Sequence, residues 1–231
     1  MRAVWIVIRL AGATAIGAAI VAQLALSLEV WAADPAADIA FLTIGFFSFF
    51  TIESNILAAI VLLIGAGFLL ARPGDDPRWF VILRLCATSY MTVTLVVYNL
   101  LLRGIELPQG STVPWSNEVL HVVGPIIIVL DWLLGPGRSR LPWSALIAVV
   151  AYPIVWVAYT LLRGVLVVDS RSGLPWYPYP FLNPDQPGGY ATVAAYVVGV
   201  ALLFALVGVG AIATSRRAGV RSAERDIAAT P

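Results

Sequence analysis

One threonine and one histidine are the side chains whose chemistry could make them work together. Thr51 lies in an apolar run at residues 46–57, and His121, the single histidine of the chain, lies in a later apolar stretch. A hydroxyl becomes a useful nucleophile when a base removes its proton, and imidazole is the side chain best matched to that task near pH 7. The pair could therefore perform nucleophilic hydrolysis. Spacing alone favours a structural role, because threonine in a membrane helix usually hydrogen-bonds its own backbone or a neighbouring helix.

Four further polar residues could assist this pair. Asn55, Asn99 and Asn117 could each donate a hydrogen bond to an oxyanion. Helix side chains three and four positions apart share a face, so Glu118 is expected beside His121 and could orient its imidazole. The alternative role of all four is hydrogen bonding between helices, which satisfies polar groups in lipid.

Three charged residues are expected to pair with one another inside the membrane. Arg9, Arg84 and Asp131 each lie about five to seven residues inside a predicted span, or roughly 7 to 10 Å deep at 1.5 Å per residue. A charge in hydrocarbon costs several kcal/mol unless it finds a partner. The sequence therefore predicts an ion cluster that joins the first, third and fourth spans. Alternatively, both arginines extend to the headgroups and leave Asp131 to other partners.

The composition places these residues in a membrane protein. Hydrophobic residues make up 60% of the 231 residues, charged residues make up 12%, and the mean hydropathy is +0.91. A net charge of +1, without a basic stripe, argues against binding to nucleic acid. Cys86 is the only cysteine, so neither an intramolecular disulfide nor a Cys/His metal site is expected. A threonine hydrolase needs no cofactor, and membrane lipids are the expected partners.

The chain is predicted to be an all-α bundle of six transmembrane helices. The apolar blocks are about 20 residues or longer, the length that crosses roughly 30 Å of hydrocarbon. The predicted spans are residues 3–28, 40–71, 78–102, 117–135, 143–165 and 189–214. Residues 1–214 would form the transmembrane domain, and residues 215–231 a short arginine-rich tail without order. The aromatic run at residues 176–181 is expected at the boundary between water and lipid.

The distribution of arginine predicts that both termini face the cytoplasm, since the chain contains no lysine. One side of the predicted membrane carries nine arginines: Arg2, Arg72, Arg78, Arg138, Arg140, Arg216, Arg217, Arg221 and Arg225. The opposite loops carry three: Arg103, Arg163 and Arg171. Cytoplasmic loops are the ones enriched in basic residues. A cleaved signal peptide is the alternative for the first span, but its apolar stretch is too long and Arg9 interrupts it.

Three motifs resemble a known family. They are FFSFFTIESNIL at residues 46–57, HVVGP with DWLL at residues 121–125 and 131–134, and WYPYPFLNP at residues 176–184. Together they resemble the FAR-type, androgen-induced-gene family of six-span membrane proteins, and within it the bacterial branch called "Pr six Pr". That branch often ends the third motif with Asp, where this chain has Asn183. The likeness covers nearly the whole chain.

The resemblance implies an activity for the pair. Animal members of the family are serine-hydrolase-like enzymes that use a threonine nucleophile and a histidine to hydrolyse fatty acid esters of hydroxy fatty acids. Carried over, the nucleophile falls on Thr51 and the histidine on His121, in the plasma membrane of a bacterium, with a lipid-like substrate. The rival interpretation is a transporter or lipid-binding protein without catalysis. In that case Thr51, Glu53, Asn55 and His121 would bind a ligand or carry a proton.

Overall fold

The computed structural model of the protein describes residues 2–71, 74–105 and 112–228, with side chains described up to Arg217. The α-helices are α1 (Arg2–Ala32), α2 (Ile39–Phe47), α3 (Phe50–Ala71), α4 (Arg78–Val97), α5 (Pro114–Glu118), α6 (Gly124–Leu134), α7 (Ala145–Leu166) and α8 (Gly189–Ala228). The shorter elements are the π-helices η1 (Tyr98–Leu102) and η2 (Val119–Val123), the 3-10 helix η3 (Pro180–Leu182), and the antiparallel strands β1 (Val168–Asp169) and β2 (Leu174–Pro175).

Six of the helical segments are long and apolar enough to cross a membrane. They are Arg2–Ala32, Phe50–Ala71, Arg78–Leu102, Pro114–Leu134, Ala145–Leu166 and Gly189–Arg217. Their outward faces carry large exposed apolar side chains, among them Val7, Ile147 and Leu206, which only a hydrocarbon environment would cover. The prediction of an all-α integral membrane bundle is confirmed.

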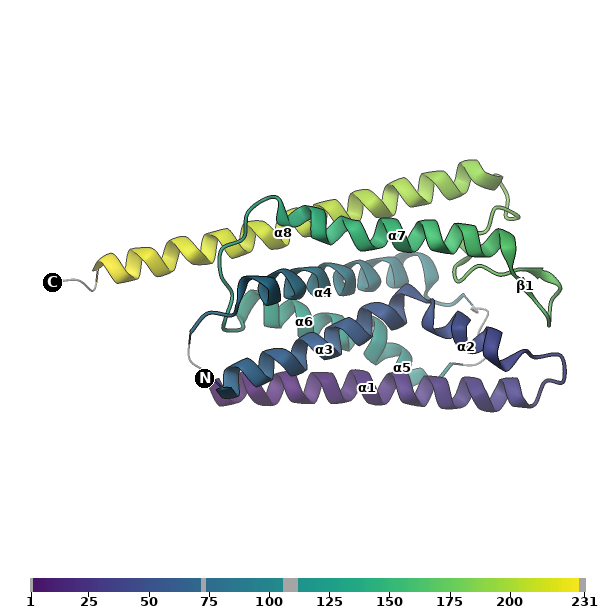
Figure 1. Ribbon diagram of the computed structural model, residues 1–231, viewed down its shortest axis with the longest axis horizontal. Helices are drawn as coiled ribbons and strands as arrows, with labels where there is room; N and C mark the ends of the chain where they lie inside the picture. The colour runs from purple at the N-terminus through teal and green to yellow at the C-terminus, as the bar shows by residue number, and fades with distance from the viewer. Residues whose placement is uncertain (1, 72–73, 106–111, 229–231) are drawn as a thin grey trace.

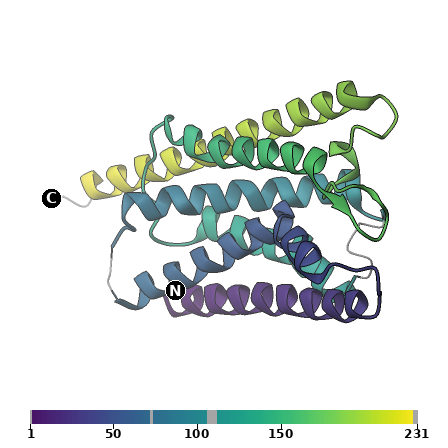
Figure 2. The same ribbon diagram turned by 45° about the vertical axis from the view of Figure 1, so that its right-hand side comes forward.

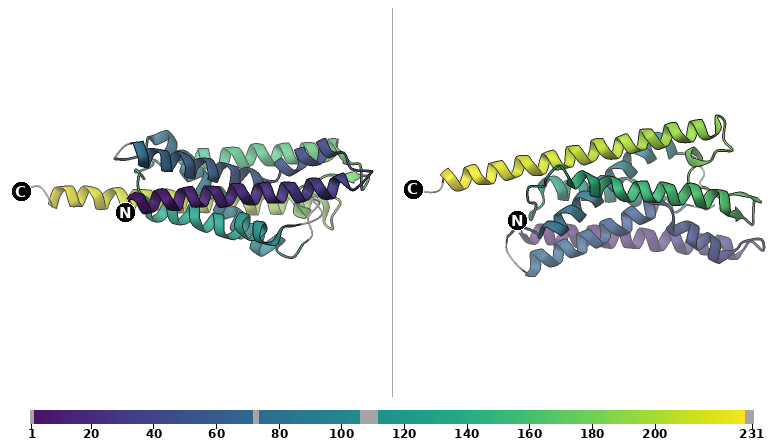
Figure 3. Two further views of the ribbon diagram at one scale, coloured as in Figure 1. Left: turned by 90° about the horizontal axis from the view of Figure 1, so that it is seen from below. Right: turned by 45° about the horizontal axis from the view of Figure 1, so that its top comes forward.

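The bundle is arranged around α4. Figure 1 shows α4 in the middle, with α7 and α8 on one side of it and α1, α3 and α6 on the other, and the rotated view in Figure 2 agrees. The start of α1 and the end of α8 lie at the same end of the bundle, which we call the terminal end. The opposite end, called the loop end, carries α2, the β-hairpin and the start of α5. The views in Figure 3 show α8 extending past the other helices at the terminal end.

The second predicted span, residues 40–71, is broken into two helices. The side chain of Ser48 donates a hydrogen bond to the carbonyl of Ile44 at 2.7 Å, a back-bond of the kind that bends helices, and α2 ends one residue earlier. The new helix, α3, begins at Phe50. Thr51 therefore lies in the first turn of a helix, where backbone N–H groups have no partner within the helix. The continuous span predicted by hydropathy was wrong at this point.

Two π-helical turns interrupt the third and fourth spans near the loop end. η1 completes the helix that begins as α4, and η2 lies between α5 and α6. Tyr98 begins η1, and His121 is the central residue of η2. Single π-turns are frequent at functional sites, because the extra residue changes the direction in which side chains project. The fourth span begins at Pro114, three residues before the predicted start.

The last helix continues past residue 214, where the predicted span ended. The backbone of α8 is helical through Ala228, since residues 215–228 contain no proline and several good helix formers. The candidate membrane span within this helix is Gly189–Arg217. Arg72, Arg221 and Arg225, three of the arginines used for the orientation, have side chains outside the described residues.

The loop between α7 and α8 folds back into the bundle. Trp176, Tyr177 and Tyr179 are each no more than 6% exposed, so their rings pack against the protein rather than against lipid or water. A Cβ at Gly45 would lie 3.0 Å from the Trp176 ring, and a Cβ at Gly164 would overlap the ring of Tyr177. Two glycines thus make room for the aromatic rings, and the loop reaches the start of α3.

Candidate functional site

Thr51 and His121 meet at the loop end of the bundle. The Thr51 Oγ1 lies 3.4 Å from the His121 Nε2, and both residues are buried. The amide of Asn55 holds the two helices in register, because it donates to the Thr51 carbonyl at 2.8 Å and to the Leu120 carbonyl at 2.9 Å. The break before α3 and the π-turn around His121 therefore bring together two residues from separate spans.

The surroundings of His121 select one tautomer. Its Nδ1 lies 2.9 Å from the carbonyl oxygen of Asn117, which can only accept a hydrogen bond. The Nδ1 must therefore carry the proton, and the Nε2 presents its lone pair to Thr51. The ring also stacks on Tyr98, with centroids 3.8 Å apart and planes 23° apart, and the Tyr98 hydroxyl receives a hydrogen bond from the Asn117 amide. The imidazole is thus fixed in the orientation of a base.

Tyr179 is a member of the site that the sequence did not single out. Its hydroxyl lies 3.3 Å from the Thr51 backbone nitrogen and 3.3 Å from the Thr51 Oγ1. The backbone N–H can only donate, so the phenol oxygen accepts from it and can donate its own proton to Oγ1. The proton of Thr51 is then available to His121. Burial raises the pKa of Tyr179 to about 12, so the phenol stays protonated near neutral pH.

The other predicted residues have different partners. Glu118 forms an ion pair with Arg103 at 2.8 Å, and both side chains are nearly half exposed. Asn99 accepts from the same Arg103 at 2.9 Å and donates to a carbonyl of its own helix. Both donor protons of Asn55 serve backbone carbonyls. What orients His121 is the carbonyl of Asn117. None of these contacts aims a spare N–H donor of Asn55 or Asn99 at Thr51.

A large apolar cavity adjoins Thr51 on one side. It has a volume of about 350 Å³ and lies among α4, α7, α8 and the loop that carries Tyr179. Its walls are almost entirely aliphatic and aromatic, as in Phe50, Val93, Val157, Val200 and Phe204. Thr51, Tyr179 and Thr94 supply its polar groups, together with two further tyrosines. Such a space suits a hydrocarbon chain with a polar group at one end.

A small cavity adjoins Thr51 on its other side. It has a volume of about 40 Å³ and is lined by His121, Asn117, Gln23 and Thr112 as well as by Thr51. A water molecule needs roughly 10 to 15 Å³ of such volume and a few polar partners. The small cavity can therefore hold a water beside the imidazole. Thr51 thus lies between a large apolar cavity and a small cavity that several polar side chains border.

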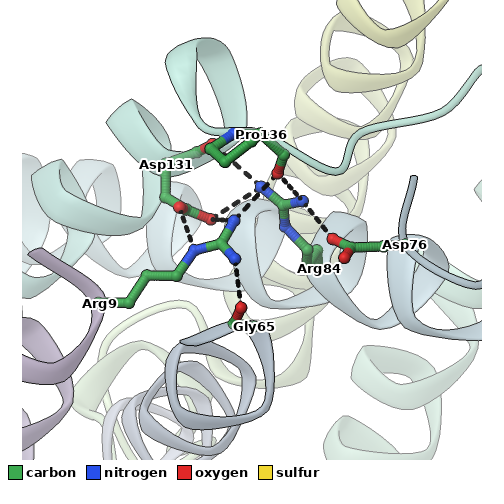
Figure 4. A network of polar contacts seen from close by, with 6 residues as sticks. All are labelled: Arg9, Gly65, Asp76, Arg84, Asp131 and Pro136. Carbon is green, nitrogen blue, oxygen red and sulfur yellow. Dashed lines mark hydrogen bonds and ion pairs between the residues drawn. The ribbon is translucent and has the colours of Figure 1, made fainter. Parts of the chain in front are cut away.

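The charged cluster is formed by residues near the start of α1, just before and near the start of α4, and near the end of α6 (Figure 4). Arg9 Nε is 2.7 Å from Asp131 Oδ1, and Arg84 Nη2 is 2.9 Å from Asp131 Oδ2. The structure contains the predicted trio and adds Asp76, whose Oδ2 lies 2.8 Å from Arg84 Nη1. The carbonyl of Gly65 accepts from Arg9 at 2.6 Å. The cluster thereby joins α1, α3, α4 and α6.

Comparison with known proteins identifies no relative of this chain. No protein-family model, no curated protein and no solved structure matches it. Within the described parts of the chain, no group of three or more His, Cys, Asp or Glu side chains is placed to hold a metal ion. The functional interpretation therefore depends on the geometry around Thr51.

Proposed function

We propose that this protein is an intramembrane hydrolase that cleaves lipid esters, with Thr51 as the nucleophile and His121 as the base. One observation carries the proposal. Thr51 Oγ1 lies 3.4 Å from an imidazole nitrogen whose lone pair is free to accept, because the other nitrogen donates to the Asn117 carbonyl. This arrangement of nucleophile, base and orienting group is the one that activates a hydroxyl.

The reaction would proceed through an acyl-enzyme. His121 Nε2 takes the proton of Thr51, and Oγ1 attacks the ester carbonyl carbon to form a tetrahedral intermediate. The imidazolium returns this proton to the alcohol oxygen as the C–O bond breaks, which leaves the acyl group on Thr51. A water, deprotonated by the same Nε2, then attacks the acyl carbon. Its proton passes through His121 to Thr51 Oγ1, the fatty acid leaves, and the site is restored.

The oxyanion would be stabilised by the groups closest to Oγ1. These are the Thr51 backbone N–H, which lies in the first turn of α3, and the phenol O–H of Tyr179. In the free site the two groups bond to each other, so a substrate oxygen must replace the phenol oxygen as the acceptor of the N–H bond. The phenol then turns its proton toward the oxyanion. Asn55, which was expected in this role, already uses both donor protons on backbone carbonyls.

The surroundings support a lipid as the substrate. The large cavity is apolar and belongs to a bundle embedded in hydrocarbon, and the small cavity offers space for the attacking water. The orientation predicted from arginine would put the site in the outer half of a bacterial plasma membrane. The resemblance to the androgen-induced-gene family favours fatty acid esters of hydroxy fatty acids as the specific substrate.

Fluorophosphonate labelling tests this proposal against the carrier alternative. A fluorophosphonate reacts with an activated hydroxyl, so the purified protein should be labelled and mass spectrometry should find the adduct on Thr51. Thr51→Ala should abolish labelling, and Thr88→Ala, which removes a buried threonine of α4 away from the site, should not. An unlabelled wild-type protein that also fails to hydrolyse a panel of lipid esters would favour a carrier.

A further inference from the structure

A lipid-facing groove lies on the flank of the bundle. It occupies about 320 Å³ between the end of the third span and α8. Its lining consists of aliphatic and glycine residues and one tyrosine, and it contains no charged side chain. The residues that matter here are Leu100, Gly199 and Leu203 on its walls, and Val97, Tyr196 and Val200 at its inner side.

The groove lies next to the cavity that adjoins Thr51. Val97, Tyr196 and Val200 line both spaces, so the two are separated by at most these side chains. Val97 is the last residue of α4, directly before the π-turn η1, and the other two are one helical turn apart on α8. A chain that enters the groove therefore reaches the wall of the reactive cavity without crossing a helix.

The surroundings of the groove determine what can occupy it. Leu100 is 76% exposed although it belongs to a membrane span, so the protein leaves it uncovered and we expect lipid beside it. A Cβ built on Gly199 would meet no atom within 4 Å, so nothing in the protein fills the space beside it. An apolar groove in contact with lipid tails is filled by such a tail at no cost in polar desolvation.

We propose that this groove is the entrance through which one acyl chain of a lipid ester passes from the bilayer to Thr51. The proposal rests on the proposed function, and it assigns the acyl side of the substrate to the large cavity. The ester carbonyl would stop at Thr51 and Tyr179, where the polar groups begin. Long-chain esters dissolved in the membrane would depend on this route, whereas short water-soluble esters would not.

A bulky side chain at Gly199 tests the route. In proteoliposomes, Gly199→Phe should lower kcat/KM for para-nitrophenyl palmitate by about tenfold or more, because the ring fills the groove. The same variant should leave kcat/KM for para-nitrophenyl acetate close to the wild-type value. Gly210→Phe is the matched control, because Gly210 lies on the same helix and its Cβ would also meet open space. Leu100→Trp narrows the groove from the opposite wall and should lower kcat/KM for para-nitrophenyl palmitate in the same way. It replaces Gly199→Phe in the test if Gly199→Phe is poorly folded.

Two results would contradict the proposal that the groove is an entrance for the acyl chain. The first is that Gly199→Phe and Gly210→Phe change kcat/KM for para-nitrophenyl palmitate by the same factor. The second is that Gly199→Phe lowers kcat/KM for para-nitrophenyl palmitate and para-nitrophenyl acetate by the same factor. Photocrosslinking separates this proposal from the hydrolase itself. A diazirine-bearing palmitate in the vesicles should label peptides of α4 and α8 in the wild type and much less in Gly199→Phe. Labelling without ester turnover would support the entrance and reject the hydrolase, and absence of labelling would reject the entrance.

Discussion

The two polar regions inside this membrane bundle satisfy their hydrogen bonds in different ways. At the terminal end, Arg9 and Arg84 face Asp76 and Asp131, so two positive and two negative side chains pair within 2.7 to 2.9 Å (Figure 4). At the loop end, Thr51, His121 and Tyr179 are neutral groups joined by contacts of 3.3 to 3.4 Å, with a cavity on either side.

The difference indicates which region holds the structure and which is available for chemistry. The charged cluster uses close, charge-assisted bonds, and removal of one partner would leave an unpaired buried charge. The loop-end site uses long bonds that can shorten when a substrate arrives. In a membrane, polar groups that bind one another closely stabilise the fold, whereas a polar group beside a cavity is accessible to a substrate.

The largest effect on activity is expected when the reactive groups of the loop-end site are removed. We expect Thr51→Ala and His121→Ala each to lower kcat/KM for a lipid ester by about 10⁴-fold or more, because nucleophile and base act as one unit. The double variant should lose little more than either single one. Thermal stability in detergent should change little for Thr51→Ala and should fall somewhat for His121→Ala, which removes a buried ring stacked on Tyr98. Thr51→Ser should keep part of the activity, since it retains the hydroxyl. Additive losses in the double variant would show that the two residues do not act together.

The second test removes a member of the charged cluster. Asp131→Ala should destabilise the protein by about 3 to 5 kcal/mol, because Arg9 and Arg84 would both lose a buried carboxylate. Denaturant unfolding in detergent micelles measures this loss. Asp185→Ala, in an exposed loop position, is the control and should be neutral. At a temperature where Asp131→Ala is folded, its activity should remain. Unchanged stability of Asp131→Ala would show that the cluster does not stabilise the fold.

The third test concerns the phenol of Tyr179. Tyr179→Phe should lower kcat by about 10²-fold, the effect expected for loss of one oxyanion donor, with a small change in KM. The pKa of Tyr179 is raised to about 12 by burial, so the phenol stays almost fully protonated up to about pH 10. The ratio of wild-type to variant kcat should therefore stay constant from about pH 7 to pH 10. A ratio that falls across this range would mean that the phenol ionises during the assay.

The smallest effect is expected for Glu118. Its carboxylate pairs with Arg103 at an exposed position and does not orient the imidazole, so Glu118→Gln should leave kcat/KM close to wild type. The pKa of Arg103 is raised by its hydrogen bond to Glu118, so this guanidinium stays charged throughout the assay range. A large loss of activity in Glu118→Gln, with His121 otherwise unperturbed, would support the role suggested by the sequence, in which Glu118 orients the imidazole of His121.

The sequence by itself determined the number of spans and three members of the buried charged cluster. Apolar stretches of about 20 residues report membrane crossing directly, because the thickness of the hydrocarbon sets the helix length. Charges inside such stretches need partners, which is why Arg9, Arg84 and Asp131 could be grouped by their positions along the chain. The same reasoning drew attention to Thr51 and His121, whose catalytic role remains a proposal.

Only the tertiary structure decided how these residues are placed. Hydropathy averages over many residues, so it did not detect the break at Ser48 that puts Thr51 at the start of a helix. Tyr179 comes from a loop without periodicity, and loop conformation depends on contacts with distant residues such as Gly45 and Gly164. The carbonyl that selects the tautomer of His121 is backbone, which every residue carries and no sequence motif marks. Spacing along the chain gives the face of a helix, but distances between helices arise only from packing.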